Sequence, residues 1–200
     1  WNTWQGGTSM GKHIRWWTPR CILAIACWTF SCAHAAADDA NYVVTVQTDF
    51  FSRYVWRGLA WSEGPVLQPS ITVAAGEFSV TGWANIGLDR RDGKNLDEVD
   101  LILSHETEVG NLGVETCLQF FAYPDQGDSP ATGEAVVSLH YPVGPLTAYV
   151  SHAADVVHYR GAHYTELRLS LERQLDARST LEVSAGVSAG SRKFNEVYVG

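Results

Sequence analysis

A repeated alternation of apolar and polar residues constrains the fold of this chain more than any other feature. Leu181, Val183, Ala185 and Val187 alternate with polar or small residues, and segments 98–103, 112–120 and 166–172 follow the same rule. A period of two residues indicates β-strands with one apolar and one polar face. These segments run to about ten residues, longer than the five or six usual in soluble sheets. The sequence therefore predicts an all-β fold.

Short and long connections alternate along the chain. Tight turns are expected at Gly76-Glu77, Gly110-Asn111, Gly144-Pro145 and Asp176-Ala177, where glycine or aspartate supplies the turn geometry. Longer polar loops, such as LDRRDGKNLD and YPDQGDSPATG, lie between them. Counted from Tyr42, this rhythm predicts nine antiparallel strands and the start of a tenth at Glu196.

Long two-faced strands joined alternately by short turns and long loops are typical of a transmembrane β-barrel. Hydrocarbon offers backbone amides no hydrogen-bond partner, so a sheet can span a bilayer only if it closes. We therefore predict that residues 36–200 form an antiparallel up-and-down transmembrane β-barrel, with about 10 to 12 strands when complete and a truncated C-terminus here. A secreted soluble β-sandwich remains the alternative, because burying the apolar face produces the same alternation.

The first 35 residues have the pattern of a secretion signal. Met10 is the only methionine, and it is followed by a basic stretch, the apolar run CILAIACWTF and small residues at Ala33 and Ala35. We predict that residues 1–9 are a non-native upstream extension, that residues 10–35 are a signal peptide cleaved after Ala35, and that the remainder is exported to the bacterial outer membrane. The residues before Cys27 and Cys32 lack a typical lipobox, which argues against a lipoprotein.

The exported part is acidic. Residues 36–200 hold 11 basic and 22 acidic side chains. Phosphate binding needs a basic face, so this balance argues against a nucleic-acid partner. Three of the four cysteines precede residue 36, and Cys117 alone cannot form a disulfide framework.

The sequence carries no motif that indicates an enzyme. It contains no P-loop and no HExxH. His152, Asp155, His158 and His163 could converge in one loop, but their spacing matches no standard metal site. We predict neither catalysis, nor a cofactor, nor a bound metal.

Aromatic residues fall near both ends of the predicted strands, where amphipathic rings suit the two membrane interfaces. The predicted interface residues are Tyr42, Phe78 and Tyr141 at the turn ends and Trp56, Trp61, Tyr123, Tyr159 and Tyr164 at the loop ends. Trp83 and Tyr149 are exceptions, because they lie in the middle of strands.

If the apolar faces meet lipid, the opposite faces line an interior. The predicted pore-lining residues are Asp49, Arg53, Arg57, Asp100, Glu115, Glu134, Glu166, Arg168 and Glu182. Carboxylates predominate, and rings of carboxylates favour cations. Arg53 and Arg57 near the rim could oppose this locally. Alternatively, the charges pair across strands and plug a narrow barrel.

Segment 52–73, SRYVWRGLAWSEGPVLQPSITV, resembles the first hairpin of the TorF-type porins of Gram-negative bacteria. The matching positions are Ser52, Tyr54, Val55, Trp56, Arg57, Gly58, Ser62 and Gln68. Arg53 stands where that family commonly has Asp, and Trp61 interrupts the polar loop, so an inherited pore charge does not follow. The resemblance implies an outer-membrane barrel.

These observations together predict passive diffusion of small polar solutes or ions. The expected partners are outer-membrane lipid, those solutes and the outer-membrane assembly machinery. Two alternatives stay open: a non-conducting structural or adhesive barrel, and a secreted soluble β-sandwich that binds a ligand.

Overall fold

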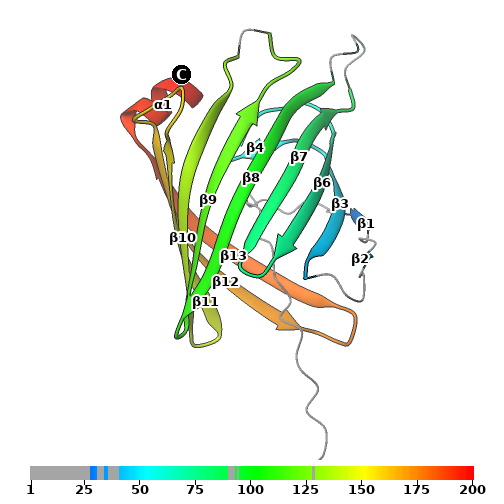
Figure 1. Cartoon of the computed structure of the whole chain (residues 1–200), viewed down its shortest axis with the longest axis vertical. Coiled ribbons are helices and arrows are strands. Elements are labelled where there is room, and N and C mark those ends of the chain that lie inside the picture. Colours follow the sequence, from blue (N-terminus) through cyan, green and yellow to red (C-terminus); the bar gives the residue numbers. More distant parts are fainter. Residues whose placement is uncertain (1–27, 31–33, 36–40, 90–92, 94, 128) are drawn as a thin grey trace, which may run out of the picture.

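The computed structural model describes residues 28–30, 34–35, 41–89, 93, 95–127 and 129–200. This part of the chain is all-β with one short helix, which confirms the predicted fold class. The long strands from residue 43 onward form a single antiparallel sheet in which each strand pairs with the next long strand of the chain (Figure 1).

The nine long strands of this sheet are those that the sequence predicts. They are β3 (Val43–Phe51), β6 (Val66–Ala75), β7 (Phe78–Gly87), β8 (Leu96–Val109), β9 (Leu112–Ala122), β10 (Thr132–Val143), β11 (Leu146–Asp155), β12 (His163–Gln174) and β13 (Thr180–Gly190). Short turns connect them at one end, which we call the turn end, and longer loops connect them at the loop end (Figure 1).

Glycine makes three of the predicted tight turns possible. Gly76, Gly110 and Gly144 have φ values of 60°, 66° and 60°, in the left-handed region that residues with a Cβ rarely adopt. Each glycine lies between two paired strands, so the turn fixes the register of the hairpin.

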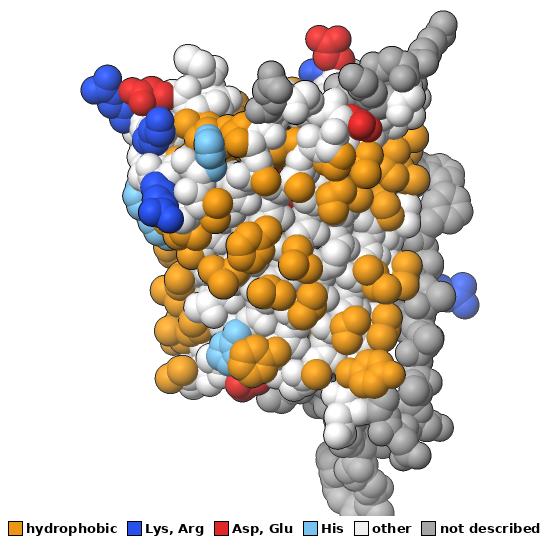
Figure 2. All heavy atoms as spheres, turned by 45° about the horizontal axis from the view of Figure 1, so that its top comes forward, with side chains coloured by type: hydrophobic (Ala, Val, Ile, Leu, Met, Phe, Trp, Pro, Cys, Tyr) orange, Lys and Arg blue, Asp and Glu red, His pale blue; other side chains and the backbone are white. Residues whose placement is uncertain are grey.

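Register places the alternating residues on two continuous faces. Val73, Val80, Leu103 and Leu118 pair side by side across β6, β7, β8 and β9, and all four are exposed. We call this the outward face. Figure 2 shows it as a band of apolar side chains, with the charged groups gathered mainly toward its ends.

The opposite, inward face is polar and largely buried. It carries Gln68, Thr72, Asp100, Glu134 and Arg168, each less than a tenth exposed. The sheet curls, so that β12 and β13 pass behind the central strands in Figure 1. The described strands β3 and β13 do not pair with each other, and the sheet is not closed by hydrogen bonds between them.

The prediction of a tenth strand at Glu196 is wrong. Residues Arg192–Tyr198 form the short helix α1. Ser191 caps it by accepting a hydrogen bond from the Phe194 amide (3.1 Å), and Arg192 pairs with Glu196 one turn later (2.7 Å). Phe194 is buried, so packing over the loop end of the sheet also favours the helix.

Two further pairings lie outside the predicted strands. The loop between β3 and β6 contains a short hairpin of two strands, β4 (Val55–Trp56) and β5 (Leu59–Ala60), each two residues long. Strands β1 (Trp28–Phe30) and β2 (His34–Ala35) pair with the free edge of β3. They lie inside the predicted signal peptide, most of which, together with residues 1–9, is outside the described residues.

No helix in the described ranges is both long and apolar enough to cross a membrane.

Candidate functional site

The inward face collects the ionisable residues that the sequence predicts for a pore lining. Those within the strands all lie there by register: Asp49, Asp100, Glu115, Glu134, Glu166, Arg168 and Glu182. Arg168 pairs in register with Tyr149 and stacks on its ring at 4.7 Å. Tyr149 therefore faces inward, which explains its position in mid-strand.

A loop residue occupies part of this face. The Arg57 guanidinium donates two hydrogen bonds to the Glu134 carboxylate on β10, at 2.8 and 2.5 Å. The two side chains are 8% and 2% exposed. Such a bidentate pair is among the stronger hydrogen-bonded contacts in proteins. It ties the β4–β5 hairpin to a strand that lies 77 residues away in sequence.

Aromatic rings surround the Arg57 guanidinium. Its central carbon lies 4.2 Å from the Trp56 ring centroid, 4.5 Å from that of Tyr164 and 5.6 Å from that of Phe194. Cations are attracted to the faces of such rings. Arg57 also has a φ of 50°, the only positive value among described residues other than glycine. The backbone therefore adopts an uncommon conformation where this contact forms.

The structure places Arg53 differently from the other predicted lining residues. Its side chain is exposed and reaches the Glu63 carbonyl at 3.5 Å. Arg57, four residues later in the β4–β5 hairpin, points inward instead. The spacing of the two arginines along the sequence does not predict which of them faces the interior.

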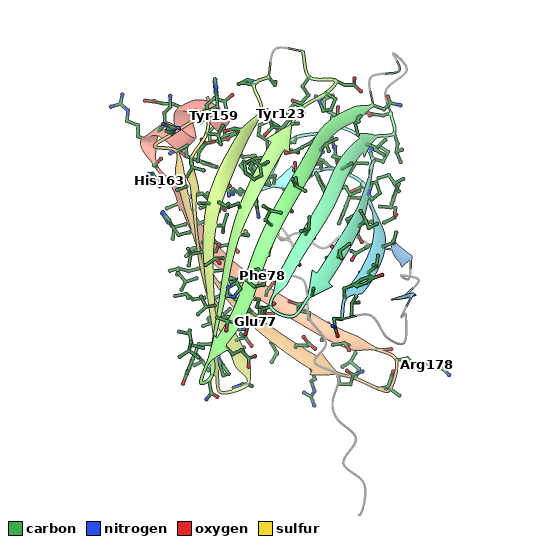
Figure 3. The ribbon with its side chains drawn as sticks, viewed as in Figure 1. Glu77, Phe78, Tyr123, Tyr159, His163 and Arg178 are labelled. Atoms are coloured by element: carbon green, nitrogen blue, oxygen red, sulfur yellow. The ribbon has the colours of Figure 1, made fainter. Side chains whose placement is uncertain are left out.

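The turn-end aromatics face outward. Tyr42, Phe78 and Tyr141 are all exposed, and the Phe78 ring lies 4.6 Å from that of His105 on the next strand. Figure 3 shows Phe78 near the turn end.

The loop-end prediction is wrong for two residues. Tyr164 is buried and faces inward, because even-numbered residues of β12 share the face of Arg168. Trp56 packs against Phe194 and Tyr198 of α1, at ring distances of 5.9 and 5.2 Å. Both rings belong to a cluster over the loop end of the sheet, which a pattern along the chain cannot reveal.

The remaining three loop-end aromatics have mixed surroundings. Trp61 is exposed on one side and contacts the Trp56 and Tyr198 rings on the other. Tyr159 lies next to α1, 5.7 Å from Tyr198, and Tyr123 lies near it at the loop end (Figure 3). Tyr123 and Tyr159 are partly buried.

Burial and nearby carboxylates raise the pKa of three tyrosines at the loop end. Burial is the largest cause for each. Glu98 and Asp100 add to it for Tyr54 and Tyr123, and Glu134 and Asp155 add to it for Tyr198. The negative carboxylates disfavour the negatively charged tyrosinate, so these tyrosines hold their protons more tightly.

A second inward cluster was missed by pattern reasoning. Trp83 on β7 pairs in register with Asp100 on β8, which pairs in turn with Phe121 on β9. The Tyr54 ring lies 5.8 Å from Trp83, and the Tyr54 hydroxyl hydrogen-bonds Glu98. The mid-strand position of Trp83 was the only sequence signal for this cluster.

The histidines of the β11–β12 region do not form a site with Asp155. His152 and His163 stack on each other at 5.5 Å on the outward face. Asp155 instead accepts hydrogen bonds from the amides of Val157 and Tyr159 and from the Thr132 hydroxyl, which orders the loop. Among the described residues no group of three or more suitable side chains could hold a metal ion.

The site therefore belongs to an all-β protein whose sheet is apolar on its exposed face and ionisable on its buried one. Searches of protein-family models, of curated proteins and of solved structures found no match to this chain.

Proposed function

We propose that this protein is an outer-membrane β-barrel of the TorF-type porin class, through which small polar solutes or ions, preferentially cations, diffuse passively. It is no enzyme in this proposal and needs no cofactor. The motif in segment 52–73 supports the family, and the acidic inward face supports the preference for cations.

One observation carries the proposal: the distribution of side chains is opposite to that of a soluble sheet. Ile71, Leu101 and Leu169 are about half exposed in mid-strand, at 51%, 46% and 49%, while Glu134 and Asp100 are 2% and 8% exposed. In water this arrangement would be unfavourable, because the free energy of a protein falls when apolar surface is removed from water. A lipid environment removes the penalty.

The proposal includes the signal peptide and the localisation to the outer membrane. Residues 10–35 direct export, and the assembly machinery of the outer membrane inserts the barrel. The test is expression of the full-length gene, followed by membrane fractionation and electrophoresis with and without heating. We expect the protein in the outer-membrane fraction with heat-modifiable mobility. A protein that stays monodisperse in buffer without detergent contradicts the proposal.

The Arg57–Glu134 pair favours a second candidate, a structural barrel with a plugged interior. The pair and its aromatic neighbours occupy the loop end of the inward face. Planar-bilayer recording separates the two functions. We expect cation-selective conductance from the folded full-length protein. Absence of conductance from protein with correct heat-modifiable mobility supports the plugged barrel, and anion selectivity rejects the predicted preference.

A further inference from the structure

Asp100 lies in an unusual environment for a carboxylate. Its register neighbours on the inward face are Trp83 on one side and Phe121 on the other, and Tyr54 contacts Trp83. Directly paired residues have Cβ atoms about 5 Å apart, so both rings lie beside the carboxylate. Asp100 is 8% exposed.

One oxygen of the Asp100 carboxylate has unused hydrogen-bonding capacity. Its Oδ1 is buried and has no hydrogen-bond partner, and no described cation lies within ion-pair distance of the carboxylate. The nearby carboxylates Glu98 and Glu134 add negative charge, and Glu134 is already engaged by Arg57. A buried carboxylate without a donor is costly, and a donor, a cation or protonation of the carboxylate relieves that cost.

The same face already shows how such a cation is held. The Arg57 guanidinium is bound by one carboxylate, Glu134, and by three aromatic rings. The Asp100 cluster repeats this combination of a carboxylate and three rings, Trp83, Phe121 and Tyr54. In the described part of the chain no side-chain cation occupies it.

We propose that Asp100, Trp83, Phe121 and Tyr54 form a binding site for a protonated alkylamine. The ammonium N–H group donates to Asp100 Oδ1, its positive charge faces the aromatic rings, and its carbon chain packs on Trp83. This inference rests on the proposed function, because the ligand reaches the inward face through the interior of the barrel. It names a class of cation that the barrel takes.

The test is calorimetric titration of the folded full-length protein in detergent micelles with n-butylammonium. n-Butanol, which has a similar shape without charge, and sodium ions are the comparison ligands. We expect saturable binding of n-butylammonium and none of either comparison ligand. Absence of saturable binding, or equal binding of n-butanol, overturns the proposal.

Two variants and a matched control assign the binding to this cluster. Asp100→Asn should weaken n-butylammonium binding at least about tenfold, since the amide oxygen still accepts a hydrogen bond but the negative charge that strengthens it is lost. Trp83→Leu should weaken it roughly fivefold through loss of the cation–π contact. Asp49→Asn removes an inward carboxylate that is hydrogen-bonded to Gln47 (2.6 Å) and should leave the affinity unchanged. An equal loss in Asp49→Asn overturns the assignment.

Binding in micelles and conductance across a bilayer are independent measurements. A protein that binds n-butylammonium but does not conduct contradicts the porin function and retains the site. A protein that conducts cations but does not bind n-butylammonium retains the porin function and rejects the site. Heat-modifiable mobility of each variant verifies that the barrel is folded.

Discussion

At the scale of single residues, the Arg57–Glu134 contact is a buried, bidentate ion pair on the inward face. Removing one member of a buried ion pair leaves the other charged and unpaired, which typically costs 3 to 5 kcal/mol. We predict that Glu134→Gln lowers the free energy of unfolding in detergent micelles by about 3 kcal/mol. The matched control is Glu166→Gln, whose partner Arg168 is 3.8 Å away and whose side chain is 32% exposed.

Glu166→Gln should cost less than about 1 kcal/mol, as expected for a partly solvated pair. Urea unfolding monitored by tryptophan fluorescence measures both variants. Equal stabilities of the two would mean that the hairpin is not held by Glu134.

The loop-end tyrosines give a prediction on alkaline stability. The pKa values of Tyr54, Tyr123 and Tyr198 are raised in the folded protein, mainly by burial. An unfolded tyrosine ionises near pH 10. The folded state therefore retains protons that the unfolded state releases, and stability falls as the pH rises above about 10.

Unfolding midpoints between pH 9 and pH 11.5 measure this effect. Tyr198→Phe should reduce the slope of stability against pH, because one of the three retained protons is removed. A slope unaffected by this substitution contradicts the assigned burial of Tyr198.

At the scale of elements, the strands were predictable and the contacts across the loop end were not. The alternation of Leu181, Val183 and their neighbours fixes which face each residue occupies, because a strand has a period of two residues. Helix α1 and the inward turn of the β4–β5 hairpin depend on contacts of the Phe194 ring with the rings of Trp56 and Tyr164. Such contacts between distant segments leave no periodic signal, and the same holds for Asp100 between Trp83 and Phe121.

Strand parity predicts costs of different size for two adjacent substitutions on β13. Val183 faces outward and is exposed, and Ser184 faces inward opposite Ser170. A charged residue on the lipid face near mid-membrane costs about 2 to 4 kcal/mol. Val183→Arg should destabilise the protein in phospholipid vesicles by about this amount, and Ser184→Arg should cost less than about 1 kcal/mol. Urea titration of folding into vesicles measures both, and equal costs would contradict the assigned faces.

At the scale of the whole molecule, a membrane barrel and a soluble sandwich differ in what covers the outward face. The band of apolar side chains over β6–β9 is exposed, and none of the described elements packs on it as a second layer (Figure 2). A soluble sandwich would need such a layer, whereas a barrel in a bilayer needs only acyl chains.

Spin labels along β8 test this most directly. Single cysteines at positions 99–104 of a Cys117→Ser protein, labelled and reconstituted into vesicles, report access to apolar oxygen and to a polar nickel complex. We predict that labels at Val99, Leu101 and Leu103 contact oxygen but not nickel, while those at Asp100, Ile102 and Ser104 show the reverse preference. Outward labels that neither reagent reaches, as beneath a second protein layer, would contradict the membrane barrel.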